Sequence, residues 1–124
     1  MKKLFFAFII VAAAAGCKKD STDTTAPVIT LTSPTDGQAF TAGQTVHVTA
    51  NISDNDEIHE VHLYVTNVAT GDTIAHFEEH LDAGSYTLDQ TFAVQAGVSY
   101  KIEVDANDHS NNEAQKILHV SAHS

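Results

Sequence analysis

From Pro27 almost to the C-terminus, apolar and polar residues alternate with a period of two. Val, Ile, Thr, Tyr and Phe are frequent in the alternating segments, and clusters of Gly, Asn and Asp separate them. Because successive side chains of a strand point to opposite faces, this pattern indicates half-buried β-strands. We expect strands near residues 28–33, 45–52, 59–66, 73–79, 86–94, 99–106 and 114–121. Short strands with turn signals at this spacing predict an all-β fold, a seven-stranded antiparallel β-sandwich.

The alternation also predicts which side chains form the core. The residues expected to point inward are Val46, Val48, Ala50 and Ile52, then Val61, Leu63 and Val65, then Tyr100, Ile102, Val104 and Ala106. The alternation does not decide which face of segment 73–79 points inward, because Ile74 and Phe77 lie on opposite faces of a strand. The predicted core therefore comes mainly from three of the seven strands.

The N-terminal segment has a different character. A basic start is followed by an apolar run over residues 4–15 and by Gly16, and the only cysteine of the chain, Cys17, comes next. A positively charged start, a short apolar stretch and small residues at the cut site are typical of a signal peptide. The apolar run is about a dozen residues long, whereas a spanning helix needs about 20. We therefore expect residues 1–16 to be a cleaved signal peptide.

The residues Ala14-Ala15-Gly16-Cys17 resemble the lipobox of bacterial lipoproteins. The resemblance implies cleavage after Gly16, a lipid thioether on the Cys17 sulfur and a fatty acyl group on its new amine. The lipid bilayer would then be a partner through acylated Cys17. Lys19-Asp20 partly matches the surface-export signal of Bacteroidota-type lipoproteins. That match implies an outer-membrane lipoprotein whose domain faces the periplasm or the cell surface.

The segment 17–26 is polar after its cysteine and lacks a core residue, so it predicts a flexible tether before one domain over residues 27–124. The whole chain has 16 acidic residues and a net charge of −10. Removal of Lys2 and Lys3 with the signal peptide makes the charge still more negative. Phosphate backbones need clustered Lys and Arg, so the sequence excludes nucleic acid as a partner.

Several short segments resemble bacterial immunoglobulin-like and fibronectin type III-like modules. Ala26-Pro27-Val28-Ile29-Thr30-Leu31 with Ser33-Pro34 resembles their opening, and Gly97-Val98-Ser99-Tyr100 resembles a tyrosine corner. Asn111 stands where Gly is common in their last turn. The resemblance covers residues 26–121 and implies an immunoglobulin-like sandwich, in which the Tyr100 hydroxyl bonds back to upstream backbone. Such modules have unrelated functions, so the fold by itself implies none.

Two acidic segments are expected at the same end of such a sandwich. They are Asp54-Asn55-Asp56-Glu57, expected to link two strands, and Asp105-Ala106-Asn107-Asp108. Calcium prefers six to eight oxygen ligands, and cadherin-like relatives bind it with similar clusters. The candidate ligands are Asp54, Asp56, Asp105, Asn107 and Asp108, and calcium is the one candidate cofactor, although none is certain. The alternative is that these side chains only cap their own turns.

Eight histidines suggest a transition-metal site as a further alternative. The candidate ligands are His62, His119, His76 and His80. His76, Glu78 and His80 share a strand face on which neighbours are about 6.6 Å apart, so one pair could bind a metal but all three could not. His62 and His119 are expected about 9.6 Å apart across strand 99–106, with Lys101 or Glu103 between them. His59 and His62 are expected on opposite faces, so they would not share an ion. The other explanation is a solvated strand face.

The sequence has no G-x-S-x-G elbow and no glycine-rich phosphate loop, and its only thiol is expected to carry lipid. We therefore expect no enzyme activity, and an envelope hydrolase is the least favoured reading. The leading hypothesis is a membrane-anchored binding or accessory module with a protein or glycan partner in the cell envelope. A calcium- or transition-metal-binding envelope module is the alternative.

Overall fold

The computed structural model describes residues 23–124, so the predicted signal peptide and the predicted lipidation site Cys17 lie outside the described residues. The described part is built from six β-strands. They are β1 (Val28–Ser33), β2 (Ala39–Thr41), β3 (Thr45–Asn67), β4 (Thr73–Ala93), β5 (Ser99–Asp108) and β6 (Glu113–His123). Residues 23–124 contain no helix long and apolar enough to cross a membrane.

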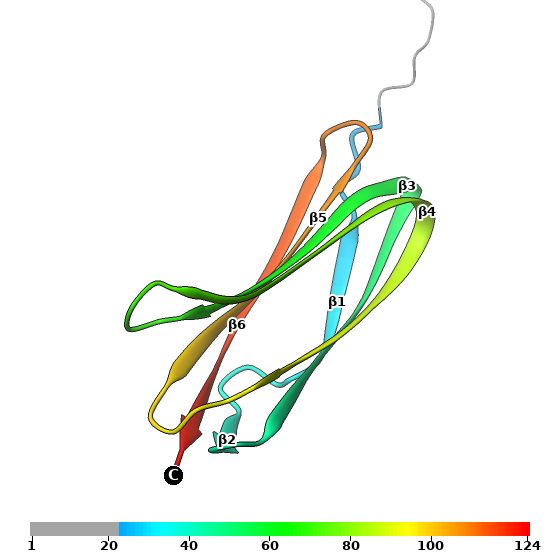
Figure 1. The fold of residues 1–124 in the computed structure, drawn as a ribbon. Coiled ribbons are helices and arrows are strands. Elements are labelled where there is room, and N and C mark those ends of the chain that lie inside the picture. Colours follow the sequence, from blue (N-terminus) through cyan, green and yellow to red (C-terminus); the bar gives the residue numbers. More distant parts are fainter. Residues whose placement is uncertain (1–22) are drawn as a thin grey trace, which may run out of the picture.

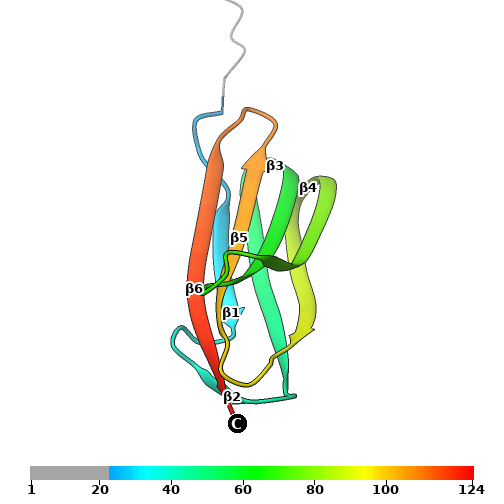
Figure 2. The same cartoon turned by 60° about the vertical axis from the view of Figure 1, so that its left-hand side comes forward.

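Two long strands, β3 and β4, connect the layers of the sandwich (Figure 1). The first half of β3 pairs with β1 and with the second half of β4. The second half of β3 pairs with β5 and with the first half of β4. β6 continues the sheet beyond β5, and β2 lies at its edge. Figure 2 shows β3 and β4 running together through the same bend. The all-β immunoglobulin-like prediction is confirmed.

The core lies between the two layers and includes every side chain that the alternation assigned to it. All eleven residues predicted to point inward are buried, among them Val46, Val61 and Ile102, each 0% exposed. The ambiguous segment is also resolved, because Phe77 packs against the core whereas Ile74 is 46% exposed. Alternation therefore identified the core correctly in the three strand segments for which an inner face was assigned; β1, the second half of β4 and β6 add further core residues.

The strand count differs from the prediction in two ways. Segments 45–52 and 59–66 form one continuous strand, and so do 73–79 and 86–94, because the pairing of β3 with β4 resumes after an irregularity between Ser53 and Ile58. The predicted loop Asp54–Glu57 is therefore part of β3. The short strand β2 was not predicted, and it pairs with β6 in parallel, so the sandwich is not purely antiparallel.

Two local features of the predicted immunoglobulin-like module are present. The backbone N–H of Gln95 donates a 2.9 Å hydrogen bond to the hydroxyl of Tyr100, which is 2% exposed. Asn111 has a φ of 64°, a left-handed conformation that Gly and Asn adopt most easily. The tyrosine corner and the special turn position are both confirmed.

Candidate functional site

Five histidines gather on the outer surface of the layer formed by β3, β4 and β5. We call this surface the histidine face; its members are His59, His62, His76, His80 and His109, with Glu60, Glu78 and Asp82. β3 and β4 supply most of it, because outward side chains of the two strands are cross-strand neighbours there. The alternation that buries Val61 and Leu63 leaves the intervening His62 facing out.

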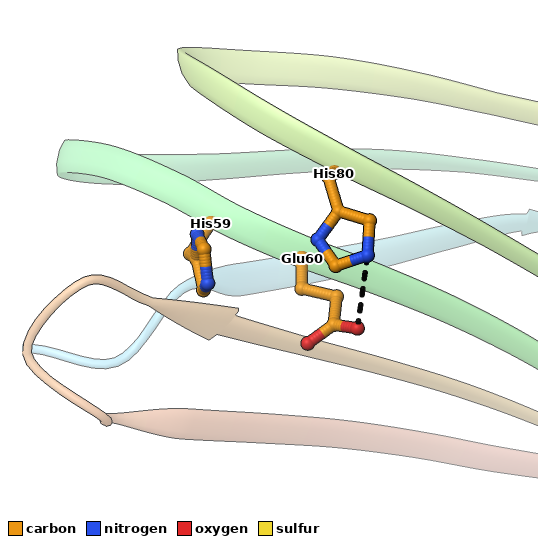
Figure 3. A group of neighbouring side chains, drawn as sticks. All are labelled: His59, Glu60 and His80. Atoms are coloured by element: carbon orange, nitrogen blue, oxygen red, sulfur yellow. Dashed lines mark ion pairs between the residues drawn. The ribbon is translucent and has the colours of Figure 1, made fainter.

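His59 lies on this same face, which corrects the prediction that it points away from His62. The pairing register shifts between Ile58 and Glu60, so a bulge interrupts the alternation at His59. Its ring lies 5.9 Å from that of His80 and 4.4 Å from that of His109. Figure 3 shows His59 and Glu60 on β3 with His80 reaching toward Glu60 from β4. A bulge of one residue thus added a histidine to the face.

One group of possible ligand atoms, His62, His76 and Glu78, combines two strands. His62 on β3 lies directly opposite Glu78 on β4, and Tyr64 lies opposite His76. His62 Nδ1 is 3.3 Å from His76 Nε2 and 3.9 Å from Glu78 Oε2. The prediction that residues 76, 78 and 80 could supply only one pair of ligands did not consider a third ligand from the neighbouring strand.

Two carboxylates contact the rings of His62 and His80. Glu60 Oε1 is 2.9 Å from His62 Nε2 and 3.7 Å from His80 Nε2. Glu78 Oε1 is 2.7 Å from His80 Nε2, and this hydrogen bond lowers the pKa of the Glu78 carboxyl. Glu60 and Glu78 are therefore each shared between the His62 and His80 imidazoles.

A second group lies at the end of the face nearest the turn between β5 and β6. His109 Nε2 is 2.8 Å from Asp82 Oδ1 and 3.8 Å from Glu57 Oε2. His59, Asp82 and His109 each offer one possible ligand atom within 4.8 Å of the others. This group was not predicted, because its three members come from three strands or their ends and only the register brings them together.

The predicted pair His62 and His119 is not brought together. His62 lies opposite Asp105 of β5, whereas His119 lies opposite Lys101. Four residues of β5 therefore separate the two positions, or about 13 Å along the strand. Both histidines are on outward-facing positions, as predicted, but the register of β3 and β6 against β5 differs from the one assumed.

Three carboxylates meet at the end of the sandwich where the chain enters the domain, the region of the predicted calcium site. We call this group the acidic apex: Asp23, Asp54 and Asp108, each with one oxygen within 4.8 Å of the others. Asp23 Oδ2 and Asp54 Oδ1 are buried without a hydrogen-bond partner. Burial and the nearby charge of Asp108 raise the pKa of the Asp54 carboxyl. Asp54 and Asp108 were predicted to converge, and they do.

Asp23 was assigned to the flexible tether, but it is attached to the domain. The side-chain amide of Asn112 donates to the Asp23 carbonyl oxygen at 2.8 Å, and that of Asn55 donates to Asp23 Oδ1 at 3.0 Å. Because these contacts span 89 and 32 positions, the local sequence carried no signal for them. Asp23, at the first described position of the predicted tether, is therefore held against the domain.

The turn-cap alternative accounts for part of the acidic apex. Asp108 is 1% exposed, and its Oδ1 accepts from the backbone N–H groups of Ser110 and Asn112 at 2.8 and 2.9 Å. Burial alone would raise the pKa of Asp108, but the hydrogen bonds led by Asn112 lower it. The backbone N–H of Asp56 likewise donates to Asp54 Oδ2 at 3.1 Å. Asp56 itself is absent from the group of converging carboxylates.

Asp105 and Asn107, the other two predicted calcium ligands, lie elsewhere. Both point outward from β5, whereas Asp108 points inward. They line a surface pocket of about 390 Å³ with His62, Ala106, Glu113, Ala114 and Gln115. Asp105 Oδ1 and Asn107 Oδ1 are buried there without a hydrogen-bond partner. Burial and the neighbouring Glu103 raise the pKa of Asp105. The pocket therefore offers free acceptor oxygens.

Comparison with known proteins decides the family. Residues 27–104 match the family described as bacterial Ig domain. The chain belongs to this family. No protein of curated function matches it.

Solved structures show the same fold for this bacterial Ig domain. The fibronectin(III)-like modules of Clostridium thermocellum CbhA are similar with a TM-score of 0.53 at 21% identity, over 77% of this chain and 96% of that one. Spo0M, a sporulation control protein from Bacillus subtilis, has a TM-score of 0.51 at 12% identity, over 79% of this chain and 49% of that one. At these identities the likeness establishes the architecture alone, so the function rests on this Ig domain's own surfaces.

Proposed function

We propose that this protein is a lipid-anchored Ig module that binds another component of the cell envelope and has no catalytic activity of its own. The lipobox-like sequence before Cys17 supports the anchor, and the family supports a binding or accessory role. The module faces the periplasm or the cell surface from the outer membrane. Its partner is an envelope protein or glycan held close to the bilayer by the short tether.

The observation that carries the binding role is the pair of buried, unpartnered oxygens in the surface pocket. A buried acceptor without a donor costs free energy, on the order of 1–3 kcal/mol. Asp105 Oδ1 and Asn107 Oδ1 would recover that cost by accepting hydrogen bonds from a ligand. The flanking Gln115 and Glu113 add further polar groups. A pocket rich in acceptors suits the hydroxyls of a glycan or the N–H groups of a protein segment.

Photo-crosslinking in intact cells tests this role. A photoreactive residue at Gln115, on the rim of the pocket, should trap a discrete envelope component of the full-length protein. The change Asn107→Ala should reduce that trapping, because it removes one free acceptor and leaves β5 paired. The matched control places the photoreactive residue at Asp89, which is exposed on β4 in the other layer. Equal trapping from Gln115 and Asp89, or trapping that Asn107→Ala leaves unchanged, would contradict the proposal.

A second candidate function is calcium binding at the acidic apex. The observation that favours it is that Asp23 and Asp54 each bury an unpartnered carboxylate oxygen beside the buried Asp108. Three carboxylates this close repel one another unless a cation lies between them. Because Asp23 belongs to the segment that leads from the anchor, a bound ion would stiffen the connection between lipid and domain. Calcium is thus a candidate structural cofactor for positioning the module above the bilayer.

A further inference from the structure

We propose that the histidine face carries a transition-metal site of the Zn²⁺ class, with His62, His76 and the Glu78 carboxylate as its protein ligands. The site is independent of the acidic apex, which offers only oxygen ligands. It is also independent of the lipid anchor and of the envelope partner, so its test does not depend on theirs. Two imidazoles and one carboxylate favour zinc, copper or nickel over calcium and magnesium.

The distances agree with a tetrahedral ion. Histidine nitrogens bind zinc at about 2.0–2.1 Å, so two of them on one tetrahedral ion lie about 3.3–3.4 Å apart. His62 Nδ1 and His76 Nε2 are 3.3 Å apart. Glu78 Oε2 lies 3.9 Å from His62 Nδ1, and its side chain is 39% exposed, so a small rotation would close the remaining gap. The two strands thus hold the donor atoms near the required spacing without an ion.

Glu60 places a carboxylate beside the His62 ring. Its Oε1 lies 2.9 Å from His62 Nε2, the ring nitrogen that does not face His76 and Glu78. A carboxylate behind a ligating histidine is the usual means of orienting the ring and raising its basicity. Glu60 is therefore a positioning residue and does not bind the ion.

Stacked aromatic rings restrict the second histidine. The His76 ring lies 4.5 Å from the Tyr64 ring with an interplanar angle of 5°, and 5.6 Å from the His62 ring with an angle of 3°. These contacts limit the rotation of His76, so less side-chain entropy is lost on binding. In the metal-free protein one of these two ring nitrogens donates to the other. When both bind an ion, each neutral ring carries its single proton on its other nitrogen, Nε2 of His62 and Nδ1 of His76.

The site is open to solvent and adjoins the surface pocket. The His62 side chain is 21% exposed, and His62 is also a lining residue of the pocket. Three protein ligands leave a tetrahedral ion one open position, for water or for a donor atom of a bound partner. The geometry therefore places a potential metal ion at the edge of the pocket that contains Asp105.

The test measures metal binding by the full-length protein in detergent. Equilibrium dialysis against Zn²⁺ gives the number of bound ions, and Co²⁺ substitution gives a visible absorption whose intensity reports tetrahedral geometry. The expected result is that His76→Gln and Glu78→Gln each lose one equivalent of zinc and the corresponding cobalt band. The change Glu60→Gln should keep the ligands but weaken binding about 10–100-fold.

His47→Gln is the matched control, because His47 is exposed on the first half of β3, in the other layer. It should leave both the stoichiometry and the cobalt spectrum unchanged. The variant His109→Gln removes a possible ligand from the neighbouring group of His59, Asp82 and His109, so it tests whether zinc binds there instead. No zinc bound to the wild type, or an equivalent lost with His109→Gln and kept with His76→Gln, would overturn the proposal. Circular dichroism in EDTA establishes that each variant is folded.

Discussion

At Tyr100 a single hydroxyl group fastens the start of β5 to the backbone before it. The ring is buried in the core and packs edge-to-face on Phe92, while the hydroxyl accepts from the Gln95 N–H. We expect Tyr100→Phe to lower the free energy of unfolding by about 1–3 kcal/mol, because it leaves a partly buried N–H without a partner. Urea unfolding of the wild type and the variant measures the difference.

The same one-atom change at Tyr86 serves as its control. Tyr86 is a half-buried tyrosine that packs against the core from β4, and we expect a smaller loss from Tyr86→Phe. Midpoints that do not differ between Tyr100→Phe and the wild type would mean that the hydrogen bond has no net effect on stability.

On the scale of the elements, the irregularity in β3 and the turn after β5 bring Asp54 next to Asp108. If calcium occupies the acidic apex, calcium at 100 times its dissociation constant should stabilise the domain by about 2.7 kcal/mol. Asp54→Asn should remove most of that gain, because it takes away a charge and the free Oδ1 while its amide oxygen can still accept from Asp56. Thermal unfolding in EDTA and in millimolar calcium measures it.

Asp89→Asn is the control for the lost charge, since Asp89 is exposed and far from the apex on β4. Sodium chloride at matched ionic strength accounts for general screening of the acidic surface. Identical unfolding curves in EDTA and calcium would rule out the calcium site and leave Asp54 and Asp108 as turn caps.

On the scale of the whole molecule, the proposed anchor at Cys17 is separated from the domain by only a few residues of sequence. The domain is strongly acidic, so its surface would be repelled by anionic lipid and cannot replace an acyl chain. We expect Cys17→Ser to leave a folded domain that no longer remains with the membranes after a carbonate wash. Cell fractionation with an immunoblot measures the distribution, and circular dichroism of the released protein tests its fold.

A Cys17→Ser protein that stays in the washed membrane pellet would contradict the lipid anchor. Protease treatment of intact cells that produce the wild type then distinguishes the two orientations. Loss of the domain from intact cells indicates display on the surface, and protection indicates the periplasm.

The sequence by itself determined most of the strand segments, the core faces of three of them, the tyrosine corner and the turn at Asn111. These features are local: side chains alternate along any strand, and the conformation of a turn depends on the residues within it. Only the tertiary structure decided which outward side chains meet. The bulge at His59, the pairing of His62 with Glu78 and the attachment of Asp23 to the apex all depend on register between distant segments. Alternation does not specify that register, because a shift of two residues keeps every side chain on its face and changes every neighbour.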